Sequence, residues 1–259
     1  LQLNAGYYYV SPNGNDANSG SFSSPWKTLS HACTVANTPG NIIFVNEGNY
    51  YVVQSLYLSV GVSIEGEGLT SRIISNIPDA PVFILESPNG TDGSQHISGI
   101  QIDGNNQPLG NAILIKGRSN VKISKSFFTN FKLGAPYYSL GTHYNEYVIE
   151  IINSSGGVEI DHNEIDGGIR AFYCHKNEYE YALQIHHNRI GKASMGAEPE
   201  VGIYVCDIDG LEVKNNYFRN LATQIILSSY ASTKLMNIFI FNNVMFNIGV
   251  TSGDWYGSG

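Results

Sequence analysis

One short phrase recurs five times from residue 121 onward, and it constrains the fold of this chain more than any other feature. Each copy holds two alternating apolar residues, a polar pair, a small polar residue and another apolar position. The third residue of each copy serves as a marker: Ile123, Ile160, Ile185, Val213 and Ile240. Such recurrence is the signature of a solenoid, in which one structural unit stacks on the next.

The spacing of the copies predicts the kind of solenoid. Three of the four steps between markers lie at 25 to 28 residues, enough for about three short strands and their turns. The strand residues are β-branched or aromatic and alternate in polarity, and no helical period lies between them. This argues against a leucine-rich horseshoe or an alternating β/α barrel. The sequence predicts an all-β fold, a parallel β-helix of about seven coils.

The small polar position of the phrase predicts a ladder of stacked side chains at a bend. Its occupants are Ser126, Asn163, Asn188, Asn216 and Asn243. Asn tolerates a left-handed backbone, and its amide both donates and accepts hydrogen bonds. We therefore expect an internal ladder here rather than a set of ligand-binding side chains.

Three histidines in the repeat, His162, His186 and His187, look like a metal-binding set. They stand at the polar positions that Lys125 and Asn215 occupy in other copies, so a solvated ladder is the expected arrangement. No Cys/His spacing typical of a metal site is present, and we expect no metal ligands.

Length and charge predict a single elongated domain over 1–259, with a cap and first coil over 7–51, repeated coils over 52–250 and a tail over 251–259. The net charge is −8 without a Lys/Arg cluster, which argues against nucleic acid as a partner. No apolar run reaches the length of a membrane span. The chain opens at Leu1 rather than at a Met, which is compatible with removal of a leader.

The three cysteines do not make a disulfide framework. Cys174 and Cys206 occupy similar places in two adjacent coils, where stacking at about 4.8 Å would bring them within disulfide range. Two buried thiols are the simpler expectation, and the sequence leaves their bonding open. Cys33 falls in a helical segment and is expected in the core.

Residues 7–51 differ from the repeated coils and are expected to close the N-terminal end, because a first coil would otherwise expose its apolar side. They predict a strand, a turn region, a short amphipathic helix over about 26–37 and another strand. The helix is the natural plug, with Trp26, Leu29 and Val35 facing inward.

The segment contains Tyr9-Val10-Ser11-Pro12, then Ser24-Pro25-Trp26-Lys27-Thr28-Leu29, Pro39-Gly40 and Gly48-Asn49-Tyr50. In this order of motifs it resembles the opening of secreted right-handed parallel β-helix proteins of the pectin-lyase-like superfamily. The resemblance covers residues 7–51. It implies the fold, export and a carbohydrate context, and it implies no catalytic residue.

Three long loops predict where a groove lies. Loops 132–146 and 191–200 fall at the same turn of the coil, and loop 175–181 falls at another. Long loops on a regular scaffold are more often functional than strand residues, although an insert that only covers a sheet edge is the alternative. The expected substrate-binding residues are Tyr137, Tyr138, His143, Tyr144 and Lys176.

The expected catalytic residues are ionisable side chains of the same coils: Glu150, Arg170, His175 and Asp207. β-Elimination of a uronic acid requires a cation and a base, roles open to Arg170 with His175 or Lys176. Hydrolysis requires two carboxyl groups about 5–10 Å apart, which Glu150 with Asp207 or Glu178 would supply.

Residues 150–153 faintly resemble the Glu-Ile-Ile-Ser stretch of the alginate lyase and chondroitinase B family, with Arg170 near the place of its second catalytic cation. The lysine of that family is missing from 153–155, and its paired-glutamate calcium motif is incomplete. No cofactor is therefore required, and calcium is the one ion left open.

The position of Glu150 in the repeat conflicts with its expected catalytic role. The repeat aligns it with Ile113 and Ile203, which would direct it into the core. A buried carboxylate needs a partner, and Arg170 in the next coil is the expected one. That pairing would make both residues structural.

The sequence favours a secreted or cell-surface enzyme acting on a polysaccharide, as a lyase on a uronate polymer or as a glycoside hydrolase. The alternative is a non-catalytic β-helix: a carbohydrate-binding module, an adhesin or a structural surface protein. Three features favour it: no complete catalytic motif, only 14 Lys and Arg, and an end soon after a full repeat, which would also suit a fragment. The expected partner is a glycan.

Overall fold

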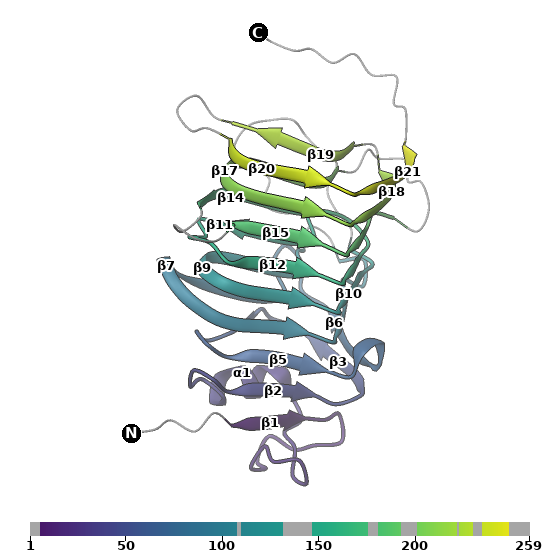
Figure 1. The fold of residues 1–259 in the computed structure, drawn as a ribbon. Helices are drawn as coiled ribbons and strands as arrows, with labels where there is room; N and C mark the ends of the chain where they lie inside the picture. The colour runs from purple at the N-terminus through teal and green to yellow at the C-terminus, as the bar shows by residue number, and fades with distance from the viewer. Residues whose placement is uncertain are drawn as a thin grey trace.

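The structure is a computed structural model that describes residues 6–107, 110–131, 147–175, 181–192, 201–221, 223–229 and 235–248. The strands pair in parallel with strands of the preceding and following coils. Figure 1 shows them stacked from β1 near the N-terminus to β19 and β20 near the C-terminus. The chain folds as the right-handed parallel β-helix that the repeat and the N-terminal resemblance together predict. None of the helices in these ranges is long and apolar enough to cross a membrane.

The larger sheet has 13 strands. They are β1 (Tyr7–Val10), β2 (Ile42–Val45), β4 (Leu56–Tyr57), β5 (Ser63–Gly66), β7 (Phe83–Ser98), β9 (Ile113–Ser124), β11 (Ile149–Ile152), β12 (Val158–Asp161), β14 (Ile169–His175), β15 (Leu183–His186), β17 (Val201–Lys214), β19 (Thr223–Ser228) and β20 (Met236–Phe241). The long strands run along two faces of a coil, since the first part of β9 pairs with β11 and its last part with β12. β17 pairs with β14 and β15 in the same way.

The smaller sheet forms the third face of the coils and has eight strands. They are β3 (Gly48–Val52), β6 (Ser71–Ser75), β8 (Gln101–Asp103), β10 (Phe127–Thr129), β13 (Glu164–Ile165), β16 (Arg189–Ile190), β18 (Tyr217–Leu221) and β21 (Val244–Ile248). A helix, α1 (Leu29–Val35), and a 3-10 turn, η1 (Gly68–Thr70), complete the described elements. Eight strands stack on this face, where the repeat predicts about seven coils.

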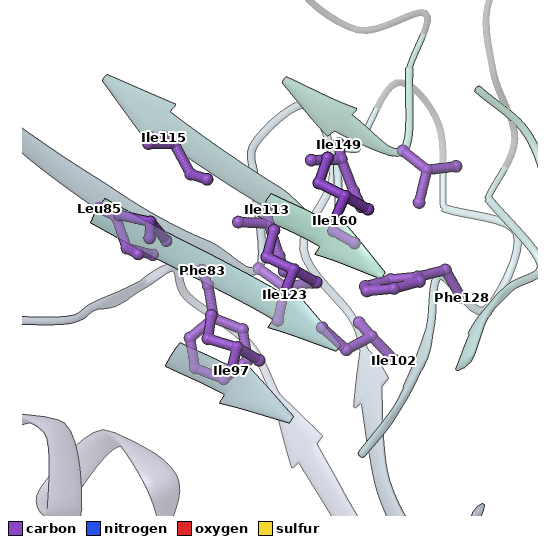
Figure 2. Close-up of a cluster of buried hydrophobic side chains, with 14 of the residues drawn as sticks. Phe83, Leu85, Ile97, Ile102, Ile113, Ile115, Ile123, Phe128, Ile149 and Ile160 are labelled. Atoms are coloured by element: carbon purple, nitrogen blue, oxygen red, sulfur yellow. The ribbon is translucent and has the colours of Figure 1, made fainter. Parts of the chain in front are cut away.

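The markers of the repeated phrase form one inward column, as the sequence predicts. It runs through Ile64, Ile97, Ile123, Ile160, Ile185, Val213 and Ile240. Figure 2 shows Ile97, Ile123 and Ile160 packed with side chains of the other two faces, such as Phe128. The column is buried as far as Val213, whereas Ile240 in the last described coil is 38% exposed.

The predicted asparagine ladder follows the phrase strands at a bend. Asn163 Nδ2 donates to Asn188 Oδ1 at 3.1 Å, and Asn188 Nδ2 donates to Asn216 Oδ1 at 3.0 Å. Asn216 Nδ2 donates to Asn243 Oδ1 at 3.0 Å. Each of these amides also donates to a backbone carbonyl of the preceding coil. Because its buried amides are satisfied internally, the ladder is structural.

Two corners of the coils are built on residues with a left-handed backbone. One corner column has φ angles of 50° to 57° at Lys125, His162, His187, Asn215 and Asn242. The other has φ angles of 52° to 74° at Gly117, Asn153, Tyr173 and Asp207. Gly, Asn and Asp adopt this conformation most readily, so Tyr173 is the costly member of the second column.

The N-terminal helix is shorter than the sequence predicts, because α1 spans Leu29–Val35 rather than 26–37. Thr28 caps it by accepting a hydrogen bond from the backbone N–H of His31 at 3.2 Å. Asp16 accepts a hydrogen bond from the backbone N–H of Thr28 at 2.9 Å. These contacts hold the preceding residues outside the helix and fix where it begins.

Helix α1 lies against β1, β3 and β4 and buries one side. Trp26 and Leu29 are buried as predicted, and Trp26 stacks on Tyr8 with ring centroids 4.9 Å apart. The expectation that Val35 faces inward is wrong, since its side chain is 46% exposed. The inward stripe continues from Leu29 to Cys33 at helical spacing, which leaves Val35 on the other side.

The expected stacking of Cys174 on Cys206 is also wrong. In the β14–β17 ladder, Cys174 lies opposite Ile208 and Cys206 lies opposite Phe172. The two strands pair in a different register from the one that the sequence suggests. Ile169 lies opposite Ile203, which places Cys174 two residues beyond the partner of Cys206. Both side chains are buried, and neither takes part in a disulfide. The two cysteines are therefore not bonded.

Candidate functional site

One row of side chains crosses the outward face of the coils at the first strand of each. It runs through Ile84, Leu114, Glu150, Arg170, Tyr204 and Ile226. Glu150 lies opposite Leu114 and Arg170, so the expected alignment with Ile113 and Ile203 is wrong by one residue. Successive strand residues point to opposite faces, and both neighbours of Glu150 are core residues. Glu150 therefore points outward.

Although it points outward, Glu150 is only 3% exposed. Its Oε1 atom lies 3.6 Å from the Nε atom of Arg170, which confirms the expected partner in the next coil. Burial raises the pKa of the Glu150 carboxyl to about 7, against a lowering by the charge of Arg170. This carboxyl is therefore able to take up or release a proton near neutral pH.

Three aromatic rings surround the Arg170 guanidinium. Its Cζ atom lies 4.1 Å from the ring centroid of Phe172 and 5.7 Å from that of Tyr147. The ring of Tyr204 lies 5.5 Å from Phe172 and 6.3 Å from Tyr147. We refer to these residues, with Glu150, as the Glu150 cluster. Arg170 and Tyr204 are partly exposed, so the cluster reaches the surface.

Sequence reasoning missed the three aromatic members of the cluster. Phe172 and Tyr204 are outward residues of β14 and β17, and Tyr147 lies two residues before the start of β11. A correct strand register would have found Tyr204, because it places this residue opposite Arg170.

The other two expected catalytic residues lie away from this row. His175 follows the left-handed corner at Tyr173, is exposed, and lies opposite Asp209 in the ladder. Asp207 occupies the same corner in the next coil, is fully buried, and accepts a hydrogen bond from the Ser229 hydroxyl at 3.2 Å. The chain turns at this corner, so the strand geometry groups Glu150 with Arg170 and not with His175.

The expected substrate-binding residues Tyr137, Tyr138, His143, Tyr144 and Lys176 lie outside the described residues, and so does Glu178. Their roles stay predictions. The loop that holds most of them ends at Tyr147, which belongs to the Glu150 cluster.

A concave region follows the asparagine ladder as an open groove of about 930 Å³. One wall is the corner column, in which the rings of His162 and His187 stack with centroids 4.9 Å apart. The other wall is the outward row of the short strands, where Arg189 lies 5.6 Å above the Tyr217 ring. The stacked histidines agree with the expected ladder, whereas Arg189 and Tyr217 were missed.

Comparison with known proteins places the chain in a family. Residues 12–205 match the family described as "Protein of unknown function (DUF1565)". The chain belongs to this family. No curated protein matches the chain by sequence.

Solved structures of β-helix proteins are similar to the chain. The endo-xylogalacturonan hydrolase from Aspergillus tubingensis matches with a TM-score of 0.51 and 13% identity, covering 94% of this chain and 75% of that one. A rhamnogalacturonan lyase matches with a TM-score of 0.30 and 14% identity, over 86% and 72% of the two chains. Pectate lyase Pel9A matches with a TM-score of 0.28 and 15% identity, over 90% and 79%.

These structures are pectin-lyase-like β-helix proteins, and at such identities the similarity concerns the fold alone. The match to the hydrolase agrees with the predicted β-helix fold.

Proposed function

We propose that this protein binds a polysaccharide over the outward face of β11, β14 and β17 and cleaves it there. The observation that carries the proposal is the carboxyl of Glu150, whose pKa is raised to about 7 beside the guanidinium of Arg170. Shifted carboxyl groups of this kind are typical of proton-transfer sites. The names of the similar solved structures support a polysaccharide as the class of substrate.

Two reactions fit the pair, and they use Glu150 in opposite protonation states. In β-elimination, Arg170 neutralises the carboxylate of a uronic acid, the Glu150 carboxylate accepts the C5 proton, and the C4–O bond breaks as water protonates the leaving oxygen. In hydrolysis, the protonated Glu150 donates its proton to the glycosidic oxygen, and a second carboxyl is required. Glu150 and Arg170 are thus the proposed catalytic residues.

The aromatic members of the cluster supply the expected binding surface. The rings of Tyr147, Phe172 and Tyr204 lie around Arg170, where they exclude water and offer flat apolar faces. A sugar ring seated against Tyr204 would bring its substituents to Arg170 in the adjacent strand. This arrangement supports a glycan as the partner.

The full chain should be tested on a panel of uronate and neutral polysaccharides. Unsaturated products are followed by ultraviolet absorbance, and new reducing ends are measured in parallel. Glu150→Gln should lower the rate by at least about a hundredfold, because general acid–base groups contribute that much. Glu86→Gln is the matched control, since Glu86 pairs with Lys116 at 2.7 Å on the same outward face.

The pH dependence of activity separates the two reactions. If Glu150 is the base, the rate falls as pH drops below about 7; if it is the acid, the rate falls as pH rises above about 7. A Glu150→Gln variant that reacts at the wild-type rate would rule out Glu150 as the proton-transfer residue. A wild-type rate that does not change with pH near 7 would do the same.

A non-catalytic glycan-binding protein is the second candidate. It is favoured by the pairing of Glu150 with Arg170, since each reduces the charge that the other offers to a substrate. Binding of a polysaccharide measured by calorimetry, with no product from any polymer in the panel, would support this candidate over cleavage.

We also propose that the protein acts outside the cell or at its surface. The motifs of the N-terminal segment, which resemble those of secreted β-helix proteins, support this location. Fractionation of the natural source with an antibody against the chain tests it, and recovery in the cytosol alone would overturn it.

A further inference from the structure

A compact charged cluster lies on the outward face of the phrase strands. Glu159 and Asp161 are two residues apart on β12, so they point to the same side. His186 lies on β15 opposite Asp161, and Lys122 lies on β9 opposite Glu159. We refer to these four residues as the β12 cluster. They lie on a different face of the coil from the Glu150 cluster.

Three members of the β12 cluster present metal-ligating atoms to one point. One atom each of Glu159, Asp161 and His186 lies within 4.8 Å of the other two. The Nε2 atom of His186 is 2.9 Å from Glu159 Oε1, and its Nδ1 atom is 3.0 Å from a ring nitrogen of His187. In a metal-binding histidine, a hydrogen bond at the ring nitrogen that does not bind the metal orients the imidazole.

The environment of Asp161 independently points to a cation. The residue is only 5% exposed, and its Oδ1 atom accepts no hydrogen bond from the described residues. Its Oδ2 atom accepts a hydrogen bond from His162 Nδ1 at 2.8 Å. A buried carboxylate oxygen without a donor is costly, so Oδ1 requires a positive partner.

Lys122 supplies a positive charge at this point. Its Nζ atom lies 3.0 Å from Glu159 Oε1 and 3.3 Å from Asp161 Oδ1. The Lys122 side chain is 42% exposed and flexible, so its ammonium is able to move away. The cluster therefore offers a place that a small cation can take over.

We propose that Glu159, Asp161 and His186 of the β12 cluster bind a divalent transition-metal ion, with Zn²⁺ as the best match, in competition with Lys122. One imidazole and two carboxylates form a donor set that zinc accepts, whereas calcium and magnesium prefer oxygen ligands alone. Three protein ligands leave a coordination position for water or a ligand.

Zinc binding to the full-length, chelator-treated protein tests the proposal, with affinity measured by competition against a chromophoric chelator. One equivalent should bind, and Glu159→Gln or Asp161→Asn should each weaken binding by at least about tenfold. Lys122→Met should tighten binding about tenfold, because it removes the competing positive charge. Glu65→Gln is the matched control: Glu65 lies 2.9 Å from His96, a pair outside the three-ligand group found in the described residues.

Opposite shifts in the Lys122 and carboxylate variants are the decisive result. Equal zinc affinity in wild type, Asp161→Asn and Lys122→Met would overturn the proposal. Loss of binding only in the double variant His162→Gln, His187→Gln would assign zinc to the stacked histidines instead. Tighter binding of Ca²⁺ than of Zn²⁺ would remove His186 from the ligand set. If Asp161→Asn does not fold, the exposed Lys122 and the half-buried Glu159 still provide the test.

Discussion

The asparagine ladder and the outward row of side chains that contains Glu150, here called the Glu150 row, both cross successive coils. The ladder repeats one residue type from coil to coil, whereas the row changes residue type at each coil. In the ladder, four coils present the same side chain, and each amide is satisfied by its neighbours. In the row, adjacent coils present Leu114, Glu150, Arg170 and Tyr204, and a buried carboxyl has a shifted pKa.

This difference separates residues that build the solenoid from residues that are free for another role. A position inside the coil must match the coils above and below it, so repetition is enforced by packing. An outward position meets no such requirement. Local departures from the rules of stable folding are expected at functional sites, and the Glu150 row contains such a departure.

Breaking the inward column should give the largest loss of stability. Ile185→Ala should lower the free energy of unfolding by about 2–5 kcal/mol, because a fully buried side chain leaves a cavity that rigid coils cannot fill. The outward neighbour Gln184 is the control, and Gln184→Ala should cost less than about 1 kcal/mol. Urea unfolding measures both, and equal costs would contradict the inward assignment.

The pH dependence of stability sharpens the contrast at Glu150. Its folded pKa of about 7 lies above the ordinary 4.5, so the folded state binds the proton more tightly. Stability should therefore fall by up to about 3 kcal/mol as pH rises from about 4.5 to 7, and then level off.

Urea unfolding of wild type and Glu150→Gln across this pH range provides the measurement. The variant should lack this component of the fall, since glutamine does not titrate. Parallel curves for the two proteins would show that the Glu150 carboxyl is not shifted.

Breaking the ladder should cost less than breaking the core. Asn188→Ala should destabilise by about 1–3 kcal/mol, because it leaves the buried amide of Asn163 without its acceptor. Asn49, which is exposed on β3, is the control, and Asn49→Ala should stay within about 0.5 kcal/mol. A neutral Asn188→Ala in thermal unfolding would mean that the ladder adds nothing to stability.

The smallest effect should have the opposite sign. Tyr173 holds a left-handed backbone with φ of 52° and is 43% exposed. Tyr173→Asn should stabilise by about 0.5–1 kcal/mol, since Asn adopts this conformation more readily. A lower melting temperature would instead show that the contact between the Tyr173 and Phe172 rings outweighs the backbone cost.

The fold was predictable because most of the phrase strands alternate in polarity. Ile160 and Ile185 each have a polar residue directly before and directly after them, so their inward direction is visible in the sequence. The ladder was predictable for the same reason, since Asn recurs at one place in the register. The first residue of the helix depended on the contact between Asp16 and Thr28, which no local pattern records.

The candidate site was less predictable because its strand is apolar on both faces. In β11, Ile149 and Ile151 face the core while Ile152 and Glu150 face outward, so alternation is hidden and the register slips by one residue. The adjacency of Glu150 and Arg170 survived this error. The aromatic ring of Tyr204 could not be placed without the correct pairing.

The ladder also has a direction. Asn163 donates to Asn188, Asn188 to Asn216 and Asn216 to Asn243, so every amide dipole points along the solenoid axis in the same sense. Aligned hydrogen bonds polarise one another, and each rung strengthens the acceptor that the previous rung uses. The ladder is therefore a template with polarity: a coil joins it on the C-terminal side only if it brings an acceptor to the same corner.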